Sequence, residues 1–192
     1  IRLTTPKGEK CIWRDYKGIR LHEQVTQGFF QENEKLIDWV NSQPLDNPVT
    51  CLGDGHDGVW NVITKISTST QRREILDWFH LKENIYKIGG SNKRLKKIDS
   101  LLWRGKVTET LELLMGLEKA ENFCKYLIKH QPRIVNYKDY SDRKICSIGS
   151  GAVESAVKQI DRRTKISGAQ WKKENVPQVL AHRCAYLNDQ IV

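Results

Sequence analysis

Cysteine is scarce in this 192-residue chain and never forms a C-x-x-C pair. The cysteines are an odd and scattered set, namely Cys11, Cys51, Cys124, Cys146 and Cys184. Such a set argues against a disulfide framework and against a zinc ribbon. We therefore expect a reducing compartment, the cytoplasm.

Long hydrophobic runs are also missing. No run approaches the roughly 18 apolar residues that a membrane span needs, and the first ten residues, IRLTTPKGEK, contain no signal-peptide core. The chain has no P-loop, no G-x-G-x-x-G after a strand, no G-x-S-x-G and no H-E-x-x-H. We expect neither a membrane partner nor a small-molecule cofactor.

Acidic residues are outnumbered: 23 Asp and Glu face 32 Lys and Arg, which gives a net charge of +9. A surplus of this kind indicates a polyanionic partner, with nucleic acid as the first choice and an anionic membrane surface as the second. The hydrophobic content of 39% is enough for a core. We expect one domain that carries a helical insertion.

The first half of the chain alternates between predicted strands and helices. Residues 1–22 favour two or three antiparallel strands, and residues 29–40 predict an amphipathic helix. A buried strand is predicted at 49–52, followed by a second strand at 72–78 and a helix at 79–88. This alternation is typical of the α/β class.

The second half is predicted to be mainly helical. Residues 91–131 repeat apolar positions at spacings of three and four, which indicates two to four helices, and 136–141 reads as a polar connector. Two further helices are predicted at 152–165 and 176–188. The expected division is a first core part at 1–90, a helical insertion at 91–145 and a second core part at 146–192.

The segment PVTCLGDGHDGVWN, residues 48–61, is the first candidate site. Its strand stops at Gly53, so the Asp54 carboxylate follows a strand's carboxyl end, where open α/β sheets meet ligands and metals. His56 and Asp57 crowd the same turn. The alternative is that Asp-Gly is only a common turn dipeptide.

The second candidate is Asp77-Trp78-Phe79-His80, at the predicted junction of a strand and a helix. His80 and Asn84 are one helical turn apart and share a face. The alternative is a helix cap beside a structural histidine.

The third candidate is Glu154, which follows Gly149-Ser150-Gly151 and lies in the first turn of a predicted helix. A carboxylate is favourable there for ordinary helix-start reasons too.

Two basic clusters are candidates for contacting phosphates. One begins on the helix that carries Glu154 and ends with an aromatic that can stack on a base; the other lies in the helical block. A solvated helix face is the usual explanation for either cluster alone, but the overall charge favours nucleic acid. The clusters comprise Lys158, Arg162, Arg163, Lys165, Trp171 and Lys172, and then Lys93, Arg94, Lys96 and Lys97.

Asp54 and Glu154 come from distant parts of the chain, one at a strand end and one at a helix start. Carboxylates in such a set hold hard divalent cations, which serve phosphoryl transfer by activating the attacking oxygen and stabilising the leaving one. The sequence therefore predicts Mg²⁺ or Mn²⁺, with two ions in a complete site.

Three strings resemble bacterial insertion-sequence transposases of the DDE class, in the ISKra-like branch related to Mutator-type enzymes. They are CLGDGHDGVWN, EILDWFHLKENIYKIGGS and GSGAVESAVKQIDRRTKISGAQW, and the resemblance covers nearly the whole chain. It implies an RNase H-like core, a mixed sheet with flanking helices, and an all-helical insertion before the catalytic Glu. It also implies DNA cleavage and joining by an Asp-Asp-Glu triad with two Mg²⁺ ions, and a homo-oligomer on paired transposon ends. When bound to DNA, the protein would then be associated with the nucleoid.

In this resemblance Asp54 corresponds to the second Asp of the triad and Glu154 to the Glu. Asp77 and His80 match a C/D-x-x-H motif that supports the active site without being one of the three ligands, and we group His56 and Asn84 with it. The first Asp has no match, because the surroundings of Asp15, WRDYKG, differ from the family's motif. We expect it upstream of Ile1, so that this chain is truncated and inactive alone. The alternatives are an RNase H-like nuclease without strand transfer and a non-catalytic nucleic-acid-binding relic.

Overall fold

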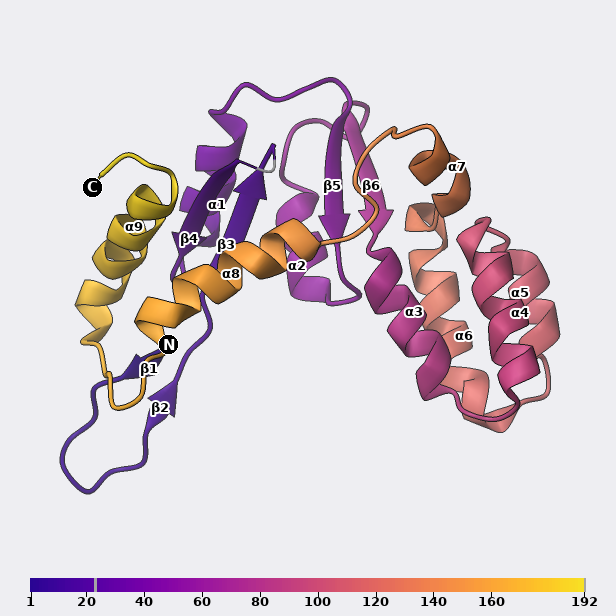
Figure 1. Cartoon of the computed structure of the whole chain (residues 1–192), viewed down its shortest axis with the longest axis horizontal. Helices are drawn as coiled ribbons and strands as arrows, with labels where there is room; N and C mark the ends of the chain where they lie inside the picture. Colours follow the sequence, from indigo (N-terminus) through magenta and orange to yellow (C-terminus); the bar gives the residue numbers. More distant parts are fainter. Residues whose placement is uncertain (23, 192) are drawn as a thin grey trace. The chain divides into compact units, whose positions relative to one another are not determined.

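The computed structural model describes residues 1–22 and 24–191 (Figure 1). The chain forms two compact units. The first contains residues 1–42 and 151–192, and the second contains residues 43–150. The termini of the chain thus belong to one unit, and the middle of the chain forms the other.

The described residues of the first unit form two antiparallel strand pairs and three α-helices. β1 (Arg2–Leu3) pairs with β2 (Ile12–Trp13), and β3 (Lys17–Leu21) pairs with β4 (Val25–Phe29). The helices are α1 (Asn33–Asn41), α8 (Gly151–Thr164) and α9 (Val176–Leu187), and η3 (Lys173–Asn175) is a 3₁₀ turn before α9.

Close packing holds α8 and α9 onto the β3–β4 pair. A Cβ atom on Gly18 in β3 would lie 2.8 Å from Val157 Cγ2, so glycine allows α8 to approach this strand closely. The Asn188 side chain accepts a bond from the backbone N–H of Thr26 and donates one to its carbonyl, both at 2.9 Å. The core of this unit is apolar and includes Leu3, Phe30, Ile160, Leu180 and Cys184.

The second unit is built on a parallel pair of strands. β5 (Val49–Gly53) lies beside β6 (Arg72–Leu76), with Gly53 opposite Leu76 (Figure 1). α2 (Asp57–Ile63) connects the two strands and α3 (Trp78–Lys87) follows β6. The remaining helices are α4 (Asn92–Trp103), α5 (Val107–Leu114), α6 (Glu121–His130) and α7 (Tyr137–Asp142), with 3₁₀ turns η1 (Glu118–Ala120) and η2 (Gln131–Arg133).

One hydrophobic core joins the helices of this unit to its strands. Ile75 and Leu76 of β6 share the core with Leu81 of α3, Ile98 of α4 and Leu127 of α6, all fully buried. The helical block predicted at 91–131 is therefore present as three α-helices and packs on β6. The predicted boundaries at residues 90 and 145 do not coincide with the limits of the two units.

Most predicted elements are confirmed, but three predictions differ from the structure. The strand predicted at 72–78 ends at Leu76, because Asp77 caps α3 and Trp78 begins that helix. The helix predicted from Phe29 begins only at Asn33, because Phe29 pairs with Lys17 at the end of β4. The predicted polar connector at 136–141 is largely helix α7: Asn136 caps it by accepting the Asp139 N–H at 3.1 Å, and Tyr137 is fully buried. Its hydroxyl donates to the Leu76 carbonyl at 2.8 Å.

The mixed α/β class is confirmed, while the RNase H-like arrangement stays a prediction. The described strands pair two by two in three separate sheets, of which only β5–β6 is parallel. No helix in residues 1–22 and 24–191 is both long and apolar enough to cross a bilayer.

Candidate functional site

The Asp54 loop, residues 54–57, follows the end of β5 directly. Asp54 is half-buried, and its Oδ1 accepts the backbone N–H of His56 at 2.8 Å. The imidazole Nδ1 of His56 accepts the Gly58 N–H at 3.0 Å and caps α2. Two successive side-chain bonds to the backbone therefore fix the turn, and His56 is a capping residue here.

Helix α6 supports the Asp54 loop from the side. A Cβ atom on Gly55 would lie 2.4 Å from Cε2 of Tyr126, so a side chain at this position would collide with the tyrosine ring. Two residues further on, the Asp57 carboxylate forms an ion pair with Lys129. The Lys129 ammonium group holds the pKa of Asp57 below its usual value.

The Tyr126 hydroxyl is buried close to the loop. Burial raises the pKa of Tyr126 to about 12, the Asn84 side chain acts in the opposite direction, and the charge of Asp54 adds to the rise. The hydroxyl has no hydrogen bond of good geometry to the described residues. Tyr126 is thus protonated at neutral pH, with a donor that lies near Asp54.

His130, the last residue of α6, is fully buried between aromatic rings. Its ring centroid lies 4.7 Å from that of Tyr126 and 6.1 Å from that of Trp60. Neither ring nitrogen has a hydrogen bond of good geometry to the described residues. Burial lowers the pKa of His130, and the nearby charges of Arg133 and Lys129 lower it further.

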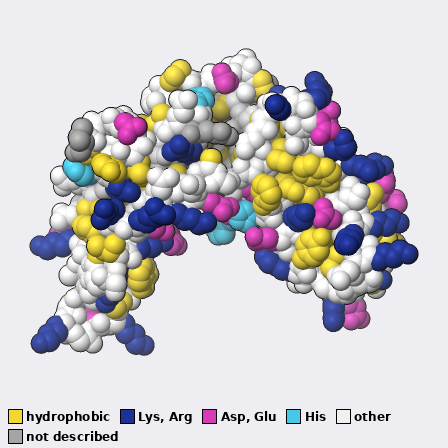
Figure 2. All heavy atoms as spheres, in the orientation of Figure 1, with side chains coloured by type: hydrophobic (Ala, Val, Ile, Leu, Met, Phe, Trp, Pro, Cys, Tyr) yellow, Lys and Arg dark blue, Asp and Glu magenta, His cyan; other side chains and the backbone are white. Residues whose placement is uncertain are grey.

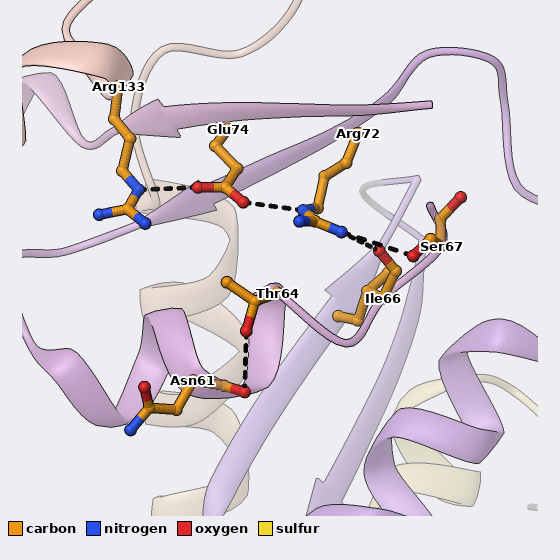
Figure 3. Close-up of polar contacts among 7 residues, drawn as sticks. All are labelled: Asn61, Thr64, Ile66, Ser67, Arg72, Glu74 and Arg133. Carbon is orange, nitrogen blue, oxygen red and sulfur yellow. Dashed lines mark hydrogen bonds and ion pairs between the residues drawn. The ribbon is translucent and has the colours of Figure 1, made fainter. Parts of the chain in front are cut away.

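Charged side chains connect η2, which follows α6, to strand β6 (Figure 3). Glu74 accepts from Arg72 Nε at 2.8 Å and from Arg133 Nε at 2.7 Å. The Arg133 guanidinium also lies over the Trp60 ring, 4.0 Å from its centroid. Burial alone would raise the pKa of Glu74, but the two arginines outweigh it, and the pKa is lowered.

Asp77 is a fully buried carboxylate that binds two backbone N–H groups. It follows β6 as Asp54 follows β5, and its backbone N–H donates to the Gly53 carbonyl at 2.8 Å. Oδ1 accepts from the His80 N–H at 2.9 Å, and Oδ2 accepts from the Ser150 N–H at 2.5 Å. Burial alone would raise the pKa of Asp77, but these hydrogen bonds outweigh it and lower the pKa.

The segment before α8 is fixed to the junction of β6 and α3 by two more contacts. The Trp78 N–H donates to the Ile148 carbonyl at 3.0 Å. A Cβ atom on Gly149 would lie 2.4 Å from Cδ2 of Phe79, so the backbone lies directly against the phenylalanine ring. Together with the Asp77 bond, these contacts hold residues 148–150, which lead in the chain to Gly151 and α8.

His80 and Asn84 lie on α3, and both are half-buried. His80 Nδ1 lies 3.4 Å from Asp77 Oδ1, so the predicted motif brings the carboxylate and the imidazole together. Asn84 accepts a bond from Lys87 Nζ at 3.1 Å. The cap interpretation of Asp77 is confirmed by its bond to the His80 N–H; its supporting role in catalysis stays a prediction.

Glu154 lies in the first turn of α8 and is exposed. It belongs to the first unit, whereas Asp54 and Asp77 belong to the second. In the described part of the chain, no group of three or more His, Cys, Asp or Glu could hold a metal. The oxygen donors of Asp54 and Glu154 suit Mg²⁺ or Mn²⁺, and their joint ligation stays a prediction.

Both predicted basic clusters lie at the surface. Figure 2 shows dark blue Lys and Arg side chains over α8. Lys158, Arg162 and Arg163 are exposed there, whereas Lys165 forms an ion pair with Asp161 at 2.9 Å. The second cluster, on α4, is exposed throughout, and consists of Lys93, Arg94, Lys96 and Lys97.

Trp171 is less available for stacking than predicted. It is half-buried against the core of the first unit, and its indole N–H donates to the Thr164 carbonyl at 2.9 Å. Its backbone bonds to Arg2 and Thr4, which ties the segment after α8 to β1. Lys172, the next residue, is exposed.

Sequence reasoning missed the residues of α6 that support the Asp54 loop. Tyr126, Lys129 and His130 follow the loop by about seventy positions, and their aromatic and basic types are ordinary on an amphipathic helix. Their spacing of three and four, which places them on one face, was the available signal.

Comparison with known protein families, with curated proteins and with solved structures gave no match to this chain.

Proposed function

We propose that this chain is the catalytic part of a DNA transposase of the DDE class, acting on insertion-sequence ends. Asp54 and Glu154 would act as two of the metal ligands. The proposal depends on the three strings that resemble this family, and the net charge of +9 supports a DNA partner.

The observation that carries the proposal is the arrangement of the two Asp residues at the ends of β5 and β6. Asp54 and Asp77 follow neighbouring parallel strands, at the edge where α/β sheets bind ligands. Both carboxylate oxygens of Asp77 already accept hydrogen bonds from backbone N–H groups, and the side chain is buried. Asp54 is therefore the more accessible of the two carboxylates. This division of roles is the one that the resemblance implies.

The reaction would be attack of an oxygen on a DNA phosphorus, with cleavage of the P–O3′ bond. Water is the attacking group in cleavage, and a DNA 3′-hydroxyl is the attacking group in joining. Bound Mg²⁺ would stabilise the negative charge on the attacking and leaving oxygens. The exposed residues Lys158, Arg162 and Arg163 would bind phosphates next to the reacting one.

The test is an assay of the protein at its natural length on DNA that contains insertion-sequence ends and Mg²⁺. Cleaved and joined products together support a transposase. Cleavage without joining would instead identify a nuclease. DNA binding without either product would identify a non-catalytic binding protein.

A further inference from the structure

Helices α8 and α9 border a pocket of about 630 Å³ within the first unit. Its volume lies in the range of ligand-binding pockets, about 300 to 1,000 Å³. The side chains that matter for its chemistry come from the end of α8, the following segment and one face of α9. They are Arg163, Trp171, Gln178, His182, Arg183 and Tyr186.

The pocket lining carries positive charge and no negative charge among the described residues. Arg163, His182 and Arg183 contribute the basic groups. Arg183 is held in place, because its Nε and Nη2 donate to the Gln159 carbonyl at 3.3 and 3.1 Å. Arg163 is exposed and forms no ion pair with the residues that the structure describes, so its guanidinium is available to an anion.

Two aromatic side chains give the pocket apolar walls. Tyr186 is 52% exposed, and the Arg183 guanidinium lies 4.9 Å from its ring centroid. Trp171 is held by its bond to Thr164. Tyr186 is the more exposed of the two rings, and an exposed ring of this kind is suited to stacking on a nucleobase.

We propose that this pocket binds an unpaired nucleotide of single-stranded DNA. The base would stack on Tyr186, and Arg163 would bind the adjacent phosphate. The exposed Gln178 amide can donate to and accept from the edge of the base. Bases inside a duplex are paired and stacked, so the pocket would select unpaired strands.

The inference rests on the proposed function only for its choice of DNA as the partner. All residues of the pocket lie in the first unit, and none of them is a predicted metal ligand. Binding at the pocket can therefore be measured without metal and without cleavage.

The experiment is fluorescence anisotropy with a labelled single-stranded oligonucleotide and with the blunt duplex of the same sequence, both in EDTA. Tyr186→Ala should weaken single-strand binding about 5- to 150-fold, the range for loss of one base-stacking contact, and should leave duplex binding nearly unchanged. Tyr186→Phe keeps the ring and should retain single-strand affinity. Arg162→Gln is the matched control, because Arg162 is exposed on α8 outside the pocket lining; it should weaken both forms of DNA alike.

Three results would overturn the inference. The first is single-strand binding that Tyr186→Ala leaves unchanged. The second is an equal loss for single strand and duplex, which would make Tyr186 a general contact. The third is displacement of the labelled oligonucleotide by free deoxyadenosine monophosphate at a concentration no higher than that of the oligonucleotide. That result would make a free nucleotide the ligand. Failure of DNA cleavage would leave these binding results intact, so the two proposals can fail separately.

Discussion

The buried carboxylate of Asp77 accepts a hydrogen bond from the backbone N–H of Ser150, which lies 73 positions later in the chain. A second bond from the His80 N–H begins α3 at the same carboxylate. One side chain therefore fixes the end of β6, the start of α3 and the segment that leads to α8.

Asp77→Asn should destabilise the protein by about 1 to 3 kcal/mol, because an amide leaves one buried N–H poorly paired. The free energy of unfolding in urea measures this. Asp142→Asn is a matched control: Asp142 is exposed and pairs with Lys138 one helical turn away, a type of pair that contributes about 0.3 to 0.5 kcal/mol. Equal losses in both variants would contradict the role assigned to Asp77.

Gly55→Ala should displace the Asp54 loop, since the new Cβ would collide with the Tyr126 ring. Overpacking of this kind costs about 1 to 3 kcal/mol, which would lower the melting temperature. Gly151→Ala is the control, because a Cβ at Gly151 meets nothing within 4 Å. If Tyr126 is the cause, Tyr126→Ala in the same chain should recover part of the loss.

Stability should fall as the pH drops below about 6.5, the ordinary pKa of histidine. The pKa of His130 is lowered in the folded protein, so the unfolded chain takes up its proton first and gains stability relative to the fold. The loss continues until the pH passes the lowered pKa of the folded state. Lys129 and Arg133 lower this pKa, and Asp57 opposes them.

His130→Phe tests this source of pH dependence. Phenylalanine keeps an aromatic ring and removes two buried nitrogens that lack good hydrogen bonds, so neutral-pH stability should be unchanged or higher. The slope of the unfolding free energy between pH 5 and 7 should become flatter.

The double variant Arg162→Gln with Arg163→Gln should weaken binding to duplexes of all sequences. The slope of log K against log salt concentration should become less steep by roughly 0.9 for each of the two phosphate contacts that are lost. Lys165→Gln should have a smaller effect, because Lys165 is paired with Asp161. An unchanged salt slope in the double variant would show that this face of α8 does not contact DNA.

Local patterns were sufficient to predict β5, β6, α3 and α8, because apolar periodicity and glycine stops define these elements. They failed at β4, where Gln27 and Gly28 are poor strand formers; its burial alternates, and Gly28 lies against Leu180 and Cys184 of α9. This strand forms because it pairs with β3 and packs on α9. The periodicity of a single sequence carries no information about such pairing.

The contacts of the candidate site were predicted only in part, and its supporting residues on α6 were not predicted. The pairing of Asp77 with His80 followed from their spacing at the start of a helix. The bond from Ser150 to Asp77 did not, because it joins positions that no local pattern relates. The same holds for the contact of Gly55 with Tyr126 and for the ion pair between Asp57 and Lys129.

The most direct test of the proposed function is Mg²⁺-dependent cleavage of insertion-sequence ends by the Glu154→Gln variant, made in the protein at its natural length. The account predicts that cleavage is abolished while affinity for DNA stays largely intact, since the substitution removes a metal ligand and keeps the basic face of α8. Undiminished cleavage by this variant would contradict the assignment of Glu154, and with it the proposal of a DDE transposase.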